Sequence, residues 1–365
     1  MYYYKEMNVR KLQNWYKKDS QPVSLEEVTP NGQEKKELPY SVEIVAEELF
    51  VPWALDITKD GRIFFTERIG NIRLIENGVL QTSPVYTFFP PFEAQGEGGL
   101  MGLVLDPDFE NNGYFYVMYT YMENGEFFNK VVRMHYEKNN TTEDKILLDK
   151  IPGERVHNGG RLKIGPDGKL YVTTGDAGQV NNSQDMNSLA GKILRMELDG
   201  RVPSDNPFKD SYVYALGLRN PQGLDWDEEG VLYGSDHGSV AHDEINLIIP
   251  GGNYGWPLSG GDFILPVFDS GDATYAPSGI AFVKEGPLAG KLLAATLRGQ
   301  QLLSMTLNDT GKQVVGTESY LKDEFGRLRE SYRHTDGSIY LTTSNLDGRG
   351  LPAAGDDKIL RLVPR

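Results

Sequence analysis

From about residue 42 onward, short apolar runs alternate with polar positions and are separated by tight turns. One phrase recurs: an apolar strand, a turn with an acidic residue and glycine, and a second strand carrying an aromatic residue. The copies are LDITKDGRIFFTER (55–68), LKIGPDGKLYVTTGD (162–176), LDWDEEGVLYGSD (224–236), YRHTDGSIYLTTSN (332–345) and a looser LVLDPDFENNGYFYVMYTY (103–121). Alternation with a period of two predicts half-buried strands, and Asp-Gly pairs favour hairpin turns. Each phrase therefore predicts a β-hairpin.

Copies of one hairpin spread along a chain indicate a repeat architecture, in which each unit needs neighbours to cover its faces. A β-propeller satisfies this requirement best, and we predict an all-β propeller over residues 39–365. An all-β sandwich or a pair of β domains is the alternative. Residues 1–38 have no clear core pattern and are predicted to form a polar leader with little regular structure.

Composition narrows the possible functions. The chain has 365 residues and a formal net charge of −15, so its surface repels phosphate backbones and a nucleic-acid partner is not expected. It has no cysteine, which excludes disulfides, thiolate nucleophiles and cysteine metal sites. No apolar run approaches the ~18 residues of a membrane span. The start of the chain lacks the apolar core of a signal peptide; the remainder of a trimmed export signal and a native cytoplasmic start both fit it.

The segment RVHNGGRLKIGPDGKLYVTTGDAG places His157 in a glycine-rich turn before one strand and Asp176 after the next. A histidine with a nearby carboxylate is the usual general-base pair, because the carboxylate fixes the tautomer and stabilises the charged imidazole. The alternative is that His157 satisfies a loop and Asp176 caps a turn.

Arginines form a second group of candidate site residues, which could bind an anionic ligand. In VYALGLRNPQGLDWD, Arg219 and Asn220 could clamp a carbonyl or carboxylate, or Arg219 could pair with an interior carboxylate. Arg327 and Arg329 are two apart, so on a strand they share one side. Two such guanidinium groups repel each other unless an anion lies between them, which suggests a polyanionic ligand; a solvated face is the alternative. Arg298 is a further candidate.

The segment GSDHGSVAHDEINLIIPGGNYGWP contains two histidines and three acids, yet its spacing is poor evidence for zinc. Calcium prefers carboxylates and backbone carbonyls, and a kinked glycine loop supplies the latter. Alternatively, Asp243 and Glu244 tie this loop to the next blade. We interpret GGNYGWP as a turn with aromatic packing.

Taken in order, several segments resemble the soluble quinoprotein glucose/sorbosone dehydrogenases, also called aldose sugar dehydrogenases. The resemblance covers about residues 51–362 and depends on VPWALDITKDGRIFFTER, GEGGLMGLVLDPDF, HNGGRLKIGPDGKLYVTTGD, LRNPQGL, DEINLIIPGGNYGWP and GRLRE. It implies a six-bladed propeller that uses pyrroloquinoline quinone (PQQ) and calcium to oxidise the anomeric hydroxyl of aldoses to lactones. It also implies an external electron acceptor and an extracytoplasmic or secreted location.

The resemblance assigns the catalytic roles residue by residue. His157 matches the base that takes the proton of the anomeric hydroxyl, and Asp176 matches the acid that orients it. Arg219 and Asn220 match residues that contact the quinone carbonyls, Arg219 with a catalytic role in stabilising negative charge.

The other matched positions concern the cofactor and the metal. Arg298 matches a cationic position that is usually lysine, and Arg327 with Arg329 matches the pair that holds the cofactor carboxylates. Gly238 and Ser239 match the loop whose backbone carbonyls bind calcium.

Two positions depart from the family pattern. Ser239 stands where proline is frequent, a change that a backbone ligand tolerates. Glu97, a candidate cofactor-binding residue, stands where glutamine is common. A carboxylate beside a tricarboxylate cofactor is unfavourable unless it is protonated or paired. A calcium-dependent lactone hydrolase and a binding propeller without the quinone are therefore the alternatives, although a hydrolase leaves the paired arginines unexplained.

Overall fold

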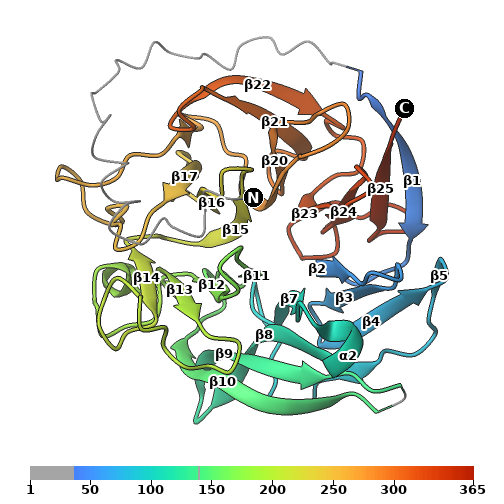
Figure 1. The fold of residues 1–365 in the computed structure, drawn as a ribbon, viewed down its shortest axis with the longest axis horizontal. Coiled ribbons are helices and arrows are strands. Elements are labelled where there is room, and N and C mark those ends of the chain that lie inside the picture. The colour runs from blue at the N-terminus through green and yellow to red at the C-terminus, as the bar shows by residue number, and fades with distance from the viewer. Residues whose placement is uncertain (1–36, 139) are drawn as a thin grey trace.

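The computed structural model of the chain describes residues 37–138 and 140–365. These residues form six antiparallel sheets that surround a central axis as blades (Figure 1). The predicted all-β, six-bladed propeller is therefore confirmed. Residues 1–36 of the predicted polar leader lie outside the described residues.

The first three blades follow one another along the chain. The first blade consists of β2 (Pro52–Ile57), β3 (Ile63–Glu67), β4 (Asn71–Glu76) and β5 (Val79–Leu80), with β6 (Tyr86–Thr87) also paired to β4. The second consists of β7 (Leu100–Leu105), β8 (Tyr114–Glu123), β9 (Glu126–His135) and β10 (Thr142–Pro152), with the short helix α2 (Phe109–Asn112) after β7. The third consists of β11 (Leu162–Ile164), β12 (Leu170–Thr174), β13 (Lys192–Met196) and β14 (Val213–Leu216), with the 3₁₀ turn η2 (Val180–Ser183) before β13.

The other three blades complete the ring. The fourth consists of β15 (Pro221–Trp226), β16 (Leu232–Asp236), β17 (Glu244–Ile248) and β18 (Phe268–Asp269). The fifth consists of β19 (Pro277–Phe282), β20 (Leu292–Thr296), β21 (Gln301–Leu307) and β22 (Val314–Tyr320). The sixth consists of β23 (Leu328–Arg333), β24 (Ile339–Thr343), β25 (Ile359–Pro364) and β1 (Tyr40–Ala46).

The ring is closed by pairing of strands from opposite ends of the chain. β1 forms the outer strand of the sixth blade and pairs antiparallel with β25, with Ile44 opposite Leu360. Figure 1 shows these two strands side by side near the C-terminus. Closure in this way gives the sixth blade four strands, the same number as the fifth blade.

The recurring phrase of the sequence forms the first hairpin of its blade. In the sixth blade, the Asp336 carboxylate accepts a hydrogen bond from the Ser338 N–H at 2.9 Å, and Gly337 has φ +83°. Asp167 accepts from the Lys169 N–H in the same way in the third blade. The acidic residue therefore closes the turn, and glycine supplies the left-handed backbone that the turn needs.

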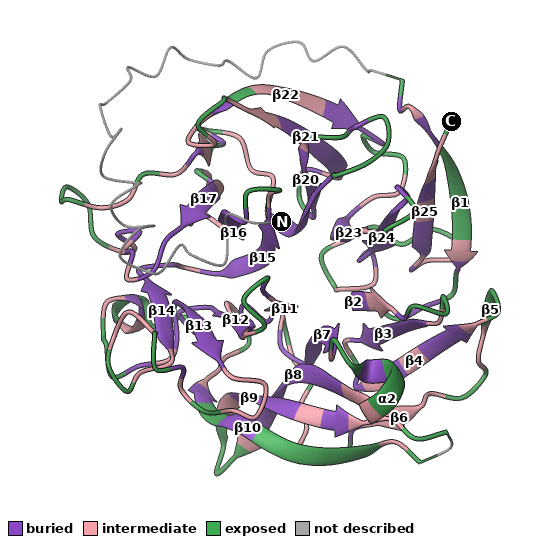
Figure 2. Cartoon of the chain, viewed as in Figure 1, coloured by how far each residue is buried: buried purple, intermediate pink, exposed green. Residues whose placement is uncertain are grey.

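The hydrophobic core lies mainly between neighbouring blades. One cluster joins Leu360 and Leu341 of the sixth blade to Leu293 and Leu302 of the fifth, and four further clusters lie elsewhere around the ring. Figure 2 shows mostly buried inner strands, whereas outer strands such as β1 and β10 carry long exposed stretches. Each blade is thus stabilised by burial against its neighbours.

The topology separates the two ends of the propeller. The turns of the recurring phrases join the first and second strands of their blades, and these turns lie at one end of the propeller. The residues that follow the second strand of each blade therefore lie at the other end. His157, Asp176 and the loop after β16 therefore share the end opposite the turns. Within the described part of the chain, no helix is long and apolar enough to cross a membrane.

Candidate active site

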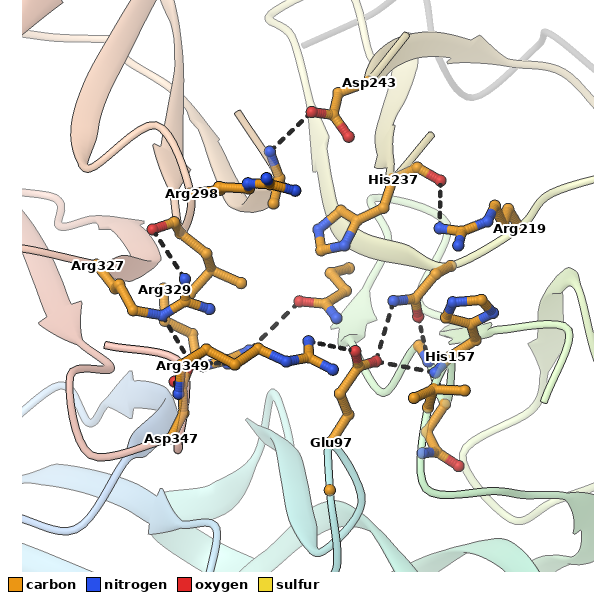
Figure 3. Close-up of a pocket in the computed structure, with 18 of the residues that line it drawn as sticks. Glu97, His157, Arg219, His237, Asp243, Arg298, Arg327, Arg329, Asp347 and Arg349 are labelled. Carbon is orange, nitrogen blue, oxygen red and sulfur yellow. Dashed lines mark hydrogen bonds and ion pairs between the residues drawn. The ribbon is translucent and has the colours of Figure 1, made fainter. Parts of the chain in front are cut away.

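A pocket of about 640 Å³ opens at this end of the central channel and is lined by residues from around the ring. Every predicted site residue except Asp176 lines it. Figure 3 shows side chains from separate blades converging on this space. The structure therefore brings together residues that are far apart in the sequence.

His157 and Asp176 form a direct pair. The Nδ1 of His157 lies 2.8 Å from the Oδ1 of Asp176, and the Asp176 side chain is fully buried behind the imidazole. Because Asp176 holds Nδ1, the other ring nitrogen, Nε2, is left for a substrate in the pocket. The pair has the arrangement of an oriented general base.

Asp176 is held by two further donors. The indole N–H of Trp256 donates to its Oδ2 at 2.9 Å, and the Gly178 N–H donates to its Oδ1 at 2.8 Å. Burial raises the pKa of Asp176, but the contacts with His157, Trp256 and Gly178 outweigh it and hold that pKa below the ordinary value. The carboxylate stays ionised and fixes the imidazole.

The backbone at His157 is specified by its neighbours. His157 has φ +55°, a conformation that non-glycine residues rarely adopt. A Cβ on Gly175 would lie 2.1 Å from the His157 carbonyl oxygen, so only glycine fits opposite this turn. The strained turn and the close approach together place the imidazole at the pocket wall.

Arg219 and Asn220 are oriented by the buried Asp236. The two oxygens of Asp236 accept hydrogen bonds from the Arg219 N–H at 2.9 Å and the Asn220 N–H at 2.6 Å. The Arg219 guanidinium then donates to the carbonyls of His237 at 3.2 Å and Gly238 at 2.7 Å. It also lies over the Trp256 ring at 5.5 Å.

The pocket has an excess of positive charge. Among the described residues that line it are three carboxylates, Glu97, Asp243 and Asp347, against six arginines. The arginines are Arg68, Arg219, Arg298, Arg327, Arg329 and Arg349. An excess of three positive charges, in a chain of net charge −15, makes this pocket a place for a polyanionic ligand.

Arg327 and Arg329 are buried, with 8% and 5% of their surface exposed, so the alternative of a solvated face is wrong. Asp347 lies between them, 2.8 Å from the Arg327 Nε and 3.7 Å from the Arg329 Nη2. Burial, together with the charges of Arg68 and Arg327, lowers the pKa of Arg329 to about 9 although Asp347 opposes this. One carboxylate does not offset the crowded cations, and an anionic ligand would stabilise them. Arg298 is exposed at the pocket rim.

The predicted calcium loop is a compact turn after β16. Asp243 accepts hydrogen bonds from the N–H groups of Gly238 at 3.0 Å, Tyr275 at 2.7 Å and Ala276 at 2.9 Å. Asp243 therefore ties the loop to the start of the fifth blade, as one interpretation of the sequence expected. Among the described residues, no group of three or more His, Cys, Asp or Glu side chains could hold a metal ion. The loop also offers backbone carbonyl oxygens, which calcium accepts as ligands.

Several residues of the site were missed from the sequence. Trp256 was assigned to packing alone, but it also donates to Asp176. Asp347 and Arg349 lie in the loop between β24 and β25, directly after a copy of the recurring phrase. That position, at the pocket end of a blade, was the signal that could have identified them.

The fold and the site together define a propeller with a histidine–aspartate pair and a cationic pocket at one channel mouth. The sequence matches the family described as glucose/sorbosone dehydrogenase over residues 49–352, and the chain belongs to this family.

Individual relatives agree with this assignment. Aldose sugar dehydrogenase YliI of Escherichia coli (strain K12) is 30% identical, with 89% of this chain and 93% of that protein covered. Quinoprotein glucose dehydrogenase B of Acinetobacter calcoaceticus is 37% identical over the matched part of the two sequences. The match covers 60% of this chain and 52% of that protein, so this chain spans about half of that relative's length. The PQQ-bound aldose sugar dehydrogenase of Streptomyces coelicolor superposes with a TM-score of 0.80 at 35% identity, covering 91% of this chain and 99% of that one.

Proposed function

We propose that this protein is a PQQ-dependent aldose sugar dehydrogenase that oxidises the anomeric hydroxyl of a sugar to a lactone. The observation that carries the proposal is the convergence, in one pocket, of the His157–Asp176 pair with an excess of guanidinium groups. The names of the relatives, which include a quinoprotein and a PQQ-bound structure, support the same conclusion.

The residues present fit the cofactor. PQQ is a tricarboxylate, and the pocket's excess of three positive charges complements it. Arg327 and Arg329 would hold carboxylates, while Arg219, Asn220 and Arg298 would contact the rest of the ring system. When bound, PQQ would supply the oxidising power for C1 of the sugar, and calcium would act as a Lewis acid beside it.

The chain's own contribution is orientation and proton transfer. The Nε2 of His157 would take the proton of the anomeric hydroxyl as the C1–H bond breaks, and Asp176 would stabilise the imidazolium that forms. Arg219 would stabilise negative charge that develops nearby. An external acceptor would then reoxidise the cofactor.

Calcium fits the loop only with help from other ligands. The carbonyls of Gly238 and Ser239 would hold it, but roughly six to eight oxygens surround this ion in proteins. The Gly238 carbonyl also accepts a hydrogen bond from Arg219 at 2.7 Å, which puts a positive charge beside the site. We therefore expect calcium to bind this loop weakly alone and more tightly when PQQ is present.

The test begins with purified protein, PQQ and calcium. PQQ binding is followed by absorbance, and dye reduction is measured with glucose and other aldoses. Calcium binding is measured by calorimetry with and without PQQ. We expect dye reduction that requires PQQ and is lost with a chelator. Absence of both PQQ binding and dye reduction would overturn the proposal, and lactone hydrolysis without PQQ would favour the hydrolase alternative.

A further inference from the structure

Glu97 lies at the centre of a hydrogen-bond network at the pocket wall. Its carboxylate accepts from the His157 N–H at 2.8 Å, the Asn220 Nδ2 at 3.3 Å and the Arg349 Nη1 at 2.6 Å. Only 18% of its side chain is exposed. Glu97 thus connects the candidate base His157 and the candidate cofactor-binding residue Asn220 to the loop that carries Arg349.

Arg349 reaches Glu97 from the sixth blade. It belongs to the loop between β24 and β25, which also carries Asp347, and 56% of its side chain is exposed. Figure 3 shows the Arg349 side chain extending across the space toward Glu97. One short loop therefore supplies a carboxylate to Arg327 and Arg329 and a guanidinium to Glu97.

The ion pair keeps Glu97 charged. Burial raises the pKa of Glu97, but the charge and hydrogen bond of Arg349, with the His157 N–H, hold that pKa below the ordinary value. An ionised carboxylate without Arg349 would face any anionic ligand of this pocket as a like charge. Glutamine at this position would need no such partner.

We propose that Arg349 is a positioning residue that neutralises Glu97, so that the pocket accepts an anionic cofactor while Glu97 fixes the backbone of His157. This inference rests on the proposed PQQ-dependent function. Arg349 acts through Glu97, and its effect therefore depends on the charge at residue 97. It explains how the pocket accommodates the carboxylate of Glu97 beside an anionic cofactor.

The test compares PQQ dissociation constants of apo-protein, measured by absorbance titration without turnover. Arg349→Gln should weaken binding about tenfold, because the uncompensated Glu97 repels the cofactor carboxylates. The double variant Glu97→Gln/Arg349→Gln should return to within about threefold of the unchanged protein, since it removes both charges. Arg349→Lys should retain most of the affinity, because it keeps the positive charge.

The control is Arg365→Gln, which breaks an ion pair with Glu37 of the same 2.6 Å length and with an arginine of similar exposure, 53%. We expect no change in PQQ affinity for this variant. Equal losses in Arg349→Gln and in the double variant would mean that Arg349 only supports its loop, and unchanged affinity in Arg349→Gln would also overturn the inference. If the unchanged protein fails to bind PQQ, the proposed function fails and this inference with it.

Discussion

The Nδ1 of His157 and the Oδ1 of Asp176 lie 2.8 Å apart, and this contact joins the loop before the third blade to the loop after its second strand. Because the carboxylate is fully buried, we expect its part in the proposed reaction to be orienting the imidazole and stabilising its charged form. The proposed reaction therefore depends on a residue that does not line the pocket.

Asp176→Asn should lower kcat by about 10²-fold or more, within the range that a positioned general base contributes. The amide keeps the size of the side chain but removes the charge that stabilises the imidazolium. PQQ affinity should stay within about threefold, because Asp176 does not line the pocket. Steady-state dye reduction and PQQ titration separate the two effects, and an unchanged kcat would contradict the assignment of the pair.

Trp256→Phe tests the second donor to Asp176. The change keeps an aromatic ring near Arg219 but removes the indole N–H that donates to the Asp176 Oδ2 at 2.9 Å. A hydrogen bond to a charged group is worth about 1.5–3 kcal/mol, and we expect a kcat lower by about tenfold. Trp226→Phe, at a buried tryptophan outside the pocket, is the matched control. It should leave kcat unchanged; equal losses in both variants would show that Trp256 only packs.

The sequence predicted the fold well because its signals are local. The Asp-Gly turn and the strands beside it lie within one phrase, and the phrase hairpins are the first hairpins of five blades. The fifth blade was not recognised as a copy, since its second strand, β20 (LLAAT), lacks the aromatic residue that the second strands of the other copies carry.

The site was predictable only in part because its contacts cross between blades. His157 and Asp176 are 19 residues apart and flank one hairpin, whereas Trp256 is 80 residues from Asp176 and Arg349 is 252 residues from Glu97. No spacing pattern connects residues so distant. Charge alone indicated that Glu97 needs a proton or a partner beside an anionic cofactor. The folded ring shows that Arg349 is this partner.

His237 should make stability depend on pH. Burial lowers its pKa to about 4, and its Nε2 donates to the Pro277 carbonyl at 3.0 Å. Between about pH 6.5 and pH 4 the unfolded chain binds a proton at this histidine that the folded chain does not, so stability falls as pH falls through this window.

His237→Gln can keep the donor to Pro277 and removes the titrating group. Its thermal midpoint should therefore fall less between pH 6.5 and pH 4 than that of the unchanged protein. Scans at matched buffer and ionic strength measure this difference. Parallel pH curves for the two proteins would show that His237 does not carry the effect.

Closure of the ring provides a test of stability that is independent of the site. Leu360 of β25 is fully buried between the fifth and sixth blades, whereas its partner across the strand pair, Ile44 of β1, is 55% exposed. Leu360→Ala should lower the free energy of unfolding by about 2–5 kcal/mol, because it removes buried methyl groups and leaves a cavity. Ile44→Ala, on the same strand pair, should lower the free energy of unfolding by no more than about 0.5 kcal/mol.

Urea denaturation followed by tryptophan fluorescence measures the free energy of unfolding of both variants. Similar losses for the two variants would mean that the backbone pairing of β1 with β25, and not burial against the neighbouring blade, stabilises the closure.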